Sequence, residues 1–389
     1  MELGLALLTA GALLLAGLAA DAVGRRVHVP RVTLIILIGV VLGRPGLDLL
    51  PAEILDLHET LAIAALTMVA FALGGELTAE TLRRHGRVIL SMSVAVALIS
   101  AACVVIGLTA LGAPLPIALA LGGVATATAP AATRDVVRES GATGPFATRL
   151  LGIVAIDDAW GLIAFGFLLS AAAAIGGNGA ADIVGSAALE LGGSVVLGLV
   201  IGAPAAALTG RLRPGEPTRI EVLGVVLICA GLAVMLGLSF LLAGMTAGVV
   251  VANFARHHER PFREIDNLQG PFLILFFVVA GATLTPEALG AAAPLAAAFA
   301  VLRAAGRLLG GFAGATAAGL SMREGRWTGA AMMPQAGVAL GMALVAGDHL
   351  PEHRDTLVAV TVASTIIFEL AGPFATQWAL RQAEREAAA

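Results

Sequence analysis

The stretch GIVAIDDAWGLIAF, residues 152–165, places two adjacent carboxylates inside an apolar segment long enough to cross a membrane. A charged side chain at the centre of a bilayer costs about 3 kcal/mol or more. Apolar sequence continues on both sides of Asp157 and Asp158, so a position at a water-exposed helix end does not explain them. Because ionisable residues inside a membrane mark ion pathways and proton relays, we treat this pair as the candidate functional site.

The composition predicts an all-α polytopic membrane protein. Of the 389 residues, 58% are hydrophobic and 13% are charged, against about 25% charged residues in a typical soluble domain. All basic residues are arginine, and the formal net charge of −4 argues against a nucleic-acid partner. We expect one membrane domain over residues 1–389, in contact with membrane lipids.

Turn and charge signals divide the chain into thirteen spans, since a spanning helix needs about 20 apolar residues. The predicted spans are 3–23, 31–43, 58–76, 88–112, 115–137, 147–174, 184–210, 219–237, 240–255, 270–285, 293–320, 327–347 and 356–380. The longest polar loop is expected at 256–270. With the N-terminus outside and the C-terminus inside, 19 of the 23 arginines fall on the cytoplasmic side, as the positive-inside rule requires.

The spans divide into two halves of six, which predicts two inverted repeats. Repeat one covers about residues 3–174, and repeat two covers about 219–380. A linking helix at about 184–210 separates them.

Proline interrupts the fifth span of each half, in ATATAPAAT (125–133) and in AMMPQAGVALG (331–341). Proline removes a helical hydrogen bond, and broken backbone at membrane depth persists only where protein buries it or a cavity adjoins it. We therefore predict that Pro130 and Pro334 mark two interrupted helices that cross. The polar side chains expected near the breaks are Thr126, Thr128, Thr133 and Gln335.

Three further ionisable residues lie within the predicted spans. Arg303 and Arg307 lie one turn apart on the eleventh span, and Glu369 lies on the thirteenth. The ends of interrupted helices carry partial charges that need compensation. We expect all three residues to form ion pairs, with Arg307 paired to Asp157; a structural and a functional role for Glu369 both stay open.

Small residues on two spans predict close helix contacts. Gly306, Gly310 and Gly314 form one ridge of the eleventh span. Gly198 and Gly202 form a GxxxG pair on the seventh span, where we expect a homodimer contact.

Several segments together resemble the cation:proton antiporter superfamily, in particular its bacterial sodium/proton exchangers with thirteen helices. The most specific are ATAPAATRDVVRESG (127–141) and GIVAIDDAWGL (152–162), supported by LLAGMTAGVVVAN, LILFFVVAGATL and FELAGP. The resemblance implies a six-helix core that moves in an elevator-like way, a homodimer, and cation and proton binding at Asp158, Asp157 and Thr128. One departure is that electrogenic relatives commonly carry a lysine where this chain has Arg307.

These observations predict a secondary antiporter rather than an enzyme, without a cofactor, in the inner (plasma) membrane. A monovalent cation, Na⁺ and also Li⁺, would compete with protons for the same carboxylate oxygens, and alternating access would turn competition into exchange. The alternatives are a K⁺/H⁺ antiporter or K⁺-efflux component, and a sodium-coupled solute symporter. The second acid favours electrogenic exchange of two protons per cation, whereas a permanent Arg307–Asp157 pair would make exchange electroneutral.

Overall fold

A computed structural model describes residues 2–27, 31–43, 46–142, 144–175, 180–209, 218–255, 259–282, 286–335 and 337–388. Within these ranges all regular structure is helical, as predicted. The first helices are α1 (Glu2–Val27), α2 (Arg31–Leu42), α3 (Ala52–Asp56), α4 (His58–Glu76), α5 (Ala79–Ala110), α6 (Leu115–Val124), α7 (Pro130–Ser140) and α8 (Pro145–Ile175). They are followed by α9 (Ala180–Thr209), α10 (Thr218–Met235), α11 (Phe240–Phe254), α12 (Glu259–Ala282), α13 (Pro286–Ala318), α14 (Met322–Ala331), α15 (Gly337–His349), the 3₁₀ turn η1 (Pro351–His353) and α16 (Arg354–Ala388).

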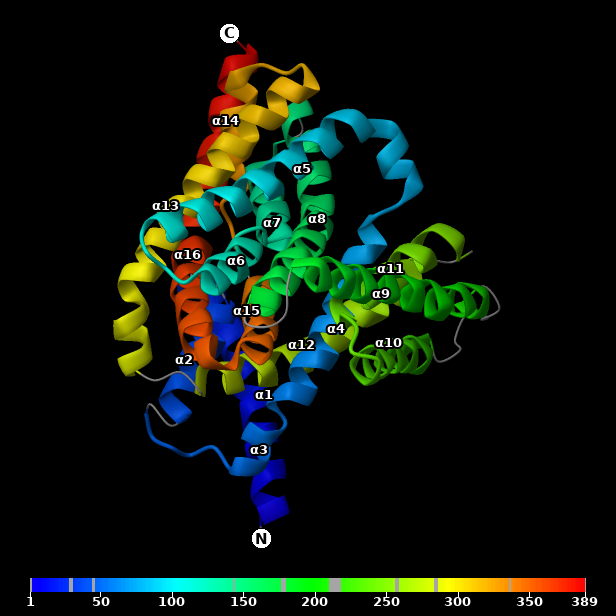
Figure 1. Ribbon diagram of the computed structural model, residues 1–389, viewed down its shortest axis with the longest axis vertical. Helices are drawn as coiled ribbons and strands as arrows, with labels where there is room; N and C mark the ends of the chain where they lie inside the picture. The colour runs from blue at the N-terminus through cyan, green and yellow to red at the C-terminus, as the bar shows by residue number, and fades with distance from the viewer. Residues whose placement is uncertain are drawn as a thin grey trace.

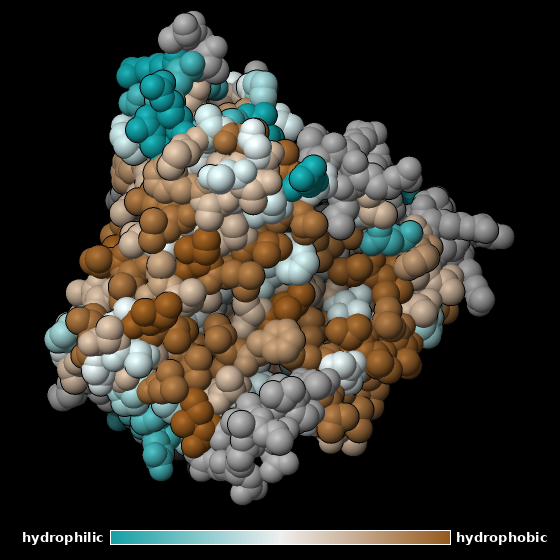
Figure 2. Space-filling view, turned by 45° about the horizontal axis from the view of Figure 1, so that its top comes forward, coloured by the Kyte–Doolittle hydropathy of each residue, from teal (hydrophilic) through white to brown (hydrophobic). Residues whose placement is uncertain are grey.

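The long apolar helices are typical of a multi-span membrane protein. Among the described residues, seven helices are long and apolar enough to cross a bilayer: α1, α5, α8, α9, α12, α13 and α16. Shorter apolar stretches lie in α4, α6 and α11. Figure 2 shows hydrophobic residues across the middle of one face, with hydrophilic residues gathered toward its margins. The start of α1 and the end of α16 lie at opposite ends of the molecule (Figure 1).

The predicted loop at 256–270 is wrong for most of its length, because α12 already begins at Glu259. The polar start of this helix has one apolar face. Ile265 is buried, and the ring of Phe262 packs on Phe71 of α4 with centroids 5.2 Å apart. On the other side, Glu264 forms an ion pair with Arg219 of α10. Burial of the apolar face offsets the weak helical preference of an otherwise charged segment.

The glycine ridge of α13 makes a close helix contact, as predicted, and its partner is α5. A Cβ atom added at Gly306, Gly310 or Gly314 would lie 2.6–2.7 Å from an α5 Cα atom. No real side chain fits that distance, so these glycines permit the backbones of α5 and α13 to approach closely. The close contact fixes α13, which carries both buried arginines, against the rest of the core.

The GxxxG pair on α9 has a different partner from the one expected. A Cβ atom at Gly198 would lie 2.6 Å from the Ala243 carbonyl oxygen, and one at Gly202 would lie 3.0 Å from the Ala247 Cα atom. Both neighbours belong to α11. The glycine pair therefore packs α9 on α11 within one chain, and this face does not offer a dimer contact.

Two more helix pairs pack with their backbones in contact. Gly39 of α2 and Gly281 of α12 face each other's helix, and Gly74 of α4 and Gly248 of α11 do the same. In each of the four positions, an added Cβ atom would lie 2.0–2.2 Å from a carbonyl oxygen of the partner helix.

Both predicted interruptions are present. In the first half, α6 ends at Val124 and α7 begins at Pro130. In the second half, α14 ends at Ala331 and α15 begins at Gly337. Figure 1 shows α6, α7 and α15 in the middle of the molecule between α8 and α16. The two breaks are thus enclosed by other helices.

Candidate functional site

The link between α6 and α7 presents carbonyl groups that helix geometry leaves unpaired. The last turn of α6 tightens, since the Thr126 N–H donates to the Gly123 carbonyl (3.1 Å) and the Ala127 N–H donates to the Val124 carbonyl (3.2 Å). Pro130, at the first position of α7, lacks an N–H where none is needed. The carbonyl oxygens of residues 125–127 therefore need other donors.

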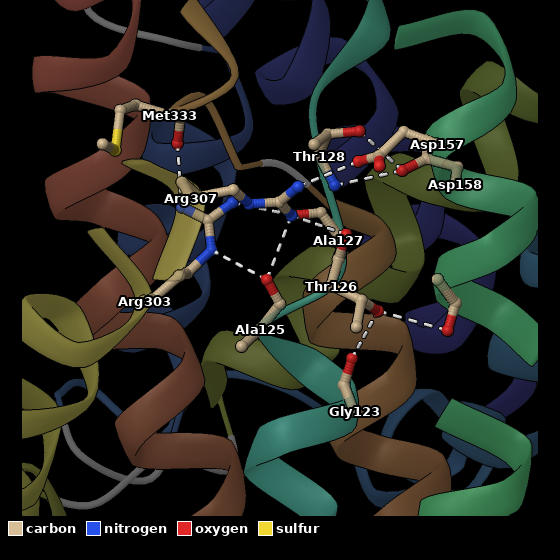
Figure 3. A network of polar contacts seen from close by, with 11 residues as sticks. Gly123, Ala125, Thr126, Ala127, Thr128, Asp157, Asp158, Arg303, Arg307 and Met333 are labelled. Atoms are coloured by element: carbon tan, nitrogen blue, oxygen red, sulfur yellow. Dashed lines mark hydrogen bonds and ion pairs between the residues drawn. The ribbon is translucent and has the colours of Figure 1, made fainter. Parts of the chain in front are cut away.

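Arg307 of α13 supplies one set of donors (Figure 3). Its Nη2 lies 2.6–3.0 Å from the carbonyl oxygens of Ala125, Thr126 and Ala127. Its Nη1 donates to Oδ2 of Asp157 at 2.9 Å, and both side chains are fully buried. The predicted ion pair is present, and the same guanidinium also neutralises the carbonyl end of α6.

Among the described residues, Arg303, one turn earlier on α13, donates hydrogen bonds to carbonyl oxygens, whereas we expected an ion pair with a carboxylate. Its guanidinium donates to the carbonyl oxygens of Ala125 (3.3 Å), Ala127 (2.7 Å) and Met333 (2.9 Å). It also lies 4.3 Å from the ring centre of Phe368 on α16. The partial negative charge at the ends of α6 and α14 explains this choice. Because one side chain contacts both links, the two interrupted helices meet at Arg303.

Asp158 is held by the same link. Its Oδ1 accepts hydrogen bonds from the Thr128 N–H (3.0 Å) and the Thr128 hydroxyl (2.8 Å). The two aspartates are about 100° apart on α8 and so do not share one face of the helix. Both reach the crossing, because the link lies beside Asp158 and the long Arg307 side chain extends to Asp157 (Figure 3).

Each aspartate has one bound and one free oxygen. Oδ1 of Asp157 and Oδ2 of Asp158 are buried and have no hydrogen-bond partner within the described part of the chain. Both carboxyl groups are fully buried. Free carboxylate oxygens beside a threonine hydroxyl are suitable ligands for a monovalent cation and equally suitable acceptors for a proton.

Two predicted threonines have structural contacts. The Thr126 hydroxyl donates to the Gly123 carbonyl (2.6 Å) and lies 3.1 Å from the Gly161 carbonyl oxygen. It therefore lies at the break, as expected, and packs the link against α8. Thr133 is buried in the first turn of α7, where its N–H donates to the Ala129 carbonyl at 3.1 Å.

The remaining predicted residues lie on the second link and on α16. A Cβ atom at Gly372 of α16 would lie 2.6 Å from the Pro334 Cα atom, so glycine lets α16 contact this link. Gln335 is fully buried, and both polar atoms of its amide group are without partners among the described residues. Glu369 is buried on α16, next to Phe368.

Sequence reasoning missed the main-chain half of the site. The carbonyl groups of Ala125, Ala127 and Met333 bind the arginines, yet alanine and methionine carry no signal for such a role. The indirect signal is the placement of Pro130 and Pro334, which shows where the helices end.

The chain is similar to known proteins over most of its length. The model of the family described as sodium/hydrogen exchanger, transmembrane, matches residues 10–382. A relative, the ammonium/H⁺ antiporter subunit AmhT of Alkalihalophilus pseudofirmus, is 27% identical over 289 residues, covering 72% of this chain and 70% of its own length. The sodium proton antiporter MjNhaP1 of Methanocaldococcus jannaschii has the same fold, with a TM-score of 0.75 at 18% identity over 98% of this chain and 96% of that one. Because the family model spans almost the whole chain, the protein belongs to the transmembrane sodium/hydrogen exchanger family, whose members are cation/proton antiporters rather than enzymes.

Proposed function

We propose that the protein exchanges a monovalent cation, Na⁺ and also Li⁺, for protons at Asp158, with Asp157 and Thr128 completing the site. The observation that carries this proposal is the pair of buried, unpartnered oxygens, Oδ1 of Asp157 and Oδ2 of Asp158. An anion buried without a partner is costly, so ionised Asp158 has to gain either a cation or a proton. The two cannot occupy the same oxygen together, and this competition is the basis of exchange.

The contacts of Arg307 favour one proton per cation, in contrast to the two protons suggested by the paired acids. Arginine does not deprotonate in proteins. Its three carbonyl contacts hold the guanidinium in place, and a protonated Asp157 would leave that charge without a carboxylate. Asp157 therefore stays ionised throughout the cycle, and Asp158 alone exchanges its proton for the cation.

The proposed movement is elevator-like, with the core of α5–α8 and α13–α16 sliding against the other helices. The two halves support an inverted repeat, because α6 and α14 each have ten residues before their break. In both halves a glycine of the following long helix contacts the link: Gly161 meets Thr126, and Gly372 meets Pro334. The glycine-mediated pairs α2–α12 and α4–α11 are likewise counterparts. We keep the repeat bounds of about 3–174 and 219–380, the thirteen spans, the external N-terminus and the plasma-membrane location as parts of this proposal.

Ammonium and K⁺ are the alternative cations. The name of the AmhT relative makes ammonium a specific candidate. We favour a small cation, because a larger one would need wider spacing between the three buried oxygens. The K⁺-efflux component and the sodium-coupled symporter are the less favoured functions, since neither explains two acids at the crossing.

The test is dye-monitored proton movement in proteoliposomes on addition of Na⁺, Li⁺, K⁺ or NH₄⁺, across a pH series. Asp158→Asn should abolish the response to every cation. Asp135→Asn, which changes an exposed aspartate on α7, is the matched control and should respond like the wild type. Wild-type exchange by the Asp158→Asn variant would refute the proposed site, and a response to K⁺ or NH₄⁺ without one to Na⁺ would replace the cation.

A further inference from the structure

One peptide group connects the buried arginines to Asp158. The carbonyl oxygen of Ala127 and the N–H of Thr128 belong to the same planar amide unit. The carbonyl end accepts from Arg303 Nη2 at 2.7 Å, and the N–H end donates to Asp158 Oδ1 at 3.0 Å. Two hydrogen bonds and one peptide group thus connect Arg303 to Asp158, which Arg303 does not contact directly.

A hydrogen bond at one end of an amide changes the strength of the bond at the other end. A cation on the carbonyl oxygen draws electron density from nitrogen, so the N–H becomes a better donor. Such chains strengthen each bond by about 10–30%, and more so in a low-dielectric interior than in water. Since a better donor stabilises the ionised form of its acceptor, Arg303 affects how readily Asp158 loses its proton.

Arg303 is better placed for this role than Arg307. Arg307 also contacts the Ala127 carbonyl, at 3.0 Å, but its Nη2 is shared among three carbonyl groups and its Nη1 binds Asp157. Arg303 gives Nη2 to Ala127 and uses Nη1 for Met333 on the other link. The Ala127 carbonyl is therefore fixed relative to both interrupted helices.

We propose that Arg303 is a positioning residue that acts on Asp158 through the Ala127–Thr128 peptide group and so sets the pH range of cation exchange. It orients the carbonyl, which aims the Thr128 N–H at Asp158, and it polarises that N–H. This inference rests on the proposed exchange role of Asp158, and it assigns to a buried arginine a function beyond joining the two links.

The other charged groups around Asp158 define what the test has to separate. Asp158 interacts electrostatically with Asp157, Arg307 and Arg303. The other ionisable groups near the middle of α8 and its neighbours are Glu369 on α16 and Glu190 on α9, of which Glu190 accepts a hydrogen bond from Ser170. At the start of α8, Arg149 pairs with Glu324 of α14. A loss of charge at position 303 acts on Asp158 through space as well as through the peptide group.

Three substitutions separate the two routes. Arg303→Met removes both the charge and the donors, Arg303→Gln removes the charge but keeps an N–H donor, and Arg303→Lys keeps the charge but loses the planar fork. For each purified variant, the pH midpoint and the cation KM of proton release are measured in proteoliposomes. Arg149→Gln is the control, because it removes a partly exposed arginine of α8 whose ion pair is with Glu324 of α14 and not with the peptide group.

We expect Arg303→Met to move the midpoint toward alkaline pH by about half a unit, a change of about threefold in proton affinity. Arg303→Gln should shift less and Arg303→Lys least, while Arg149→Gln should keep the wild-type midpoint. Equal shifts for the Gln and Met variants would overturn the peptide route, because both lose the charge and only the donor differs. A wild-type midpoint in the Arg303→Met variant would also overturn the peptide route. If that variant does not fold, wild-type midpoints in both the Gln and the Lys variants would overturn it. If Asp158→Asn still exchanges ions, the proposed site itself fails; if it does not, a missing shift contradicts the role of Arg303 alone.

Discussion

The same amide substitution should affect the two aspartates in opposite ways. Asp157→Asn removes the carboxylate that faces the buried Arg307 guanidinium. Loss of one partner from a buried ion pair costs about 3–5 kcal/mol. Arg307 keeps its three carbonyl contacts, and asparagine keeps one acceptor oxygen. We therefore expect a destabilisation at or just below the lower end of this range, about 2–3 kcal/mol.

The expected change in melting temperature follows from the size of the chain. Unfolding entropy is about 2.1 cal/mol/K per residue, which gives about 0.8 kcal/mol/K for a chain of this length. A loss of about 2–3 kcal/mol then lowers Tm by about 3 °C. Helices in a membrane keep their backbone hydrogen bonds when tertiary contacts are lost, so the actual entropy is smaller and the decrease in Tm is larger.

Asp158→Asn should leave stability nearly unchanged. Both hydrogen bonds to Asp158 come from Thr128 and end on one oxygen, which asparagine retains. The other oxygen has no partner among the described residues, so replacement by an NH₂ group breaks no hydrogen bond. The variant should melt within about 1 °C of the wild type, because no buried ion pair is broken.

Transport should be affected more by Asp158→Asn than by Asp157→Asn, the reverse of the order for stability. Asp158→Asn abolishes exchange, because an amide neither binds a proton nor balances the cation. Asp157→Asn keeps exchange with a raised cation KM, because its one amide oxygen carries no charge and is shared between Arg307 and the cation. Both properties are measured on the same preparations, by temperature-dependent loss of the monodisperse peak in detergent and by proton release in proteoliposomes. Two results would refute the assignment of ion pairing to Asp157 and exchange to Asp158. One is a normal Tm together with lost exchange in Asp157→Asn. The other is a larger decrease in Tm for Asp158→Asn than for Asp157→Asn.

Three further outcomes are expected. Thr128→Ala removes the hydroxyl but keeps the N–H that donates to Asp158. It should raise the cation KM about tenfold, in line with loss of one hydrogen bond to a charged group, and change the maximal rate less. An unchanged KM in cation titrations of proton release would show that the hydroxyl is not a ligand. With equal ion concentrations on both sides of a proteoliposome membrane, an imposed potential should drive no proton movement, and a current that reverses with the potential would establish exchange of two protons per cation. Gly198→Leu should lower Tm by disrupting the α9–α11 contact, whereas Gly192→Leu should not, because an added Cβ atom there meets no other atom within 4 Å. Native mass measurement should find a dimer in both variants. Loss of the dimer in Gly198→Leu alone would show that the glycine face of α9 does form the dimer contact.

The main features of the site could be predicted because they depend on residue types that are rare in a membrane. Charges at Asp157, Asp158, Arg303 and Arg307 are conspicuous in apolar sequence, and prolines at corresponding positions indicate where the helices break. The Arg307–Asp157 pair follows from the cost of an unpaired buried charge. In these cases the sequence offers few residues that could satisfy the physical requirement, so the partner can be named in advance.

Predictions failed where several partners satisfied the same requirement. A GxxxG pair indicates close packing but does not identify the neighbouring helix, and Gly198 and Gly202 pack on α11. Similarly, a buried guanidinium needs acceptors, and carbonyl groups at a helix end satisfy it as well as a carboxylate does, as at Arg303. Backbone acceptors exist at every residue, so only the folded chain shows which of them an arginine uses.

Under the proposed function, the charges at the crossing would keep exchange coupled in a chain that has no lysine. Two helix C-termini and two helix N-termini meet there, and their partial charges of about −0.5 and +0.5 each cancel. Arg307 is balanced by Asp157, and we propose that Glu369, buried on α16 next to Phe368, balances Arg303. The crossing is then neutral when Asp158 is protonated, and also when ionised Asp158 holds a monovalent cation. It carries one net negative charge only when Asp158 is ionised and empty, and a low-dielectric interior disfavours that state most. A core that moves across the membrane while neutral would carry either a proton or a cation in each direction, and would rarely move with an empty site. A lysine at position 307 could release its proton and so change this balance of charges, whereas arginine stays charged throughout the cycle.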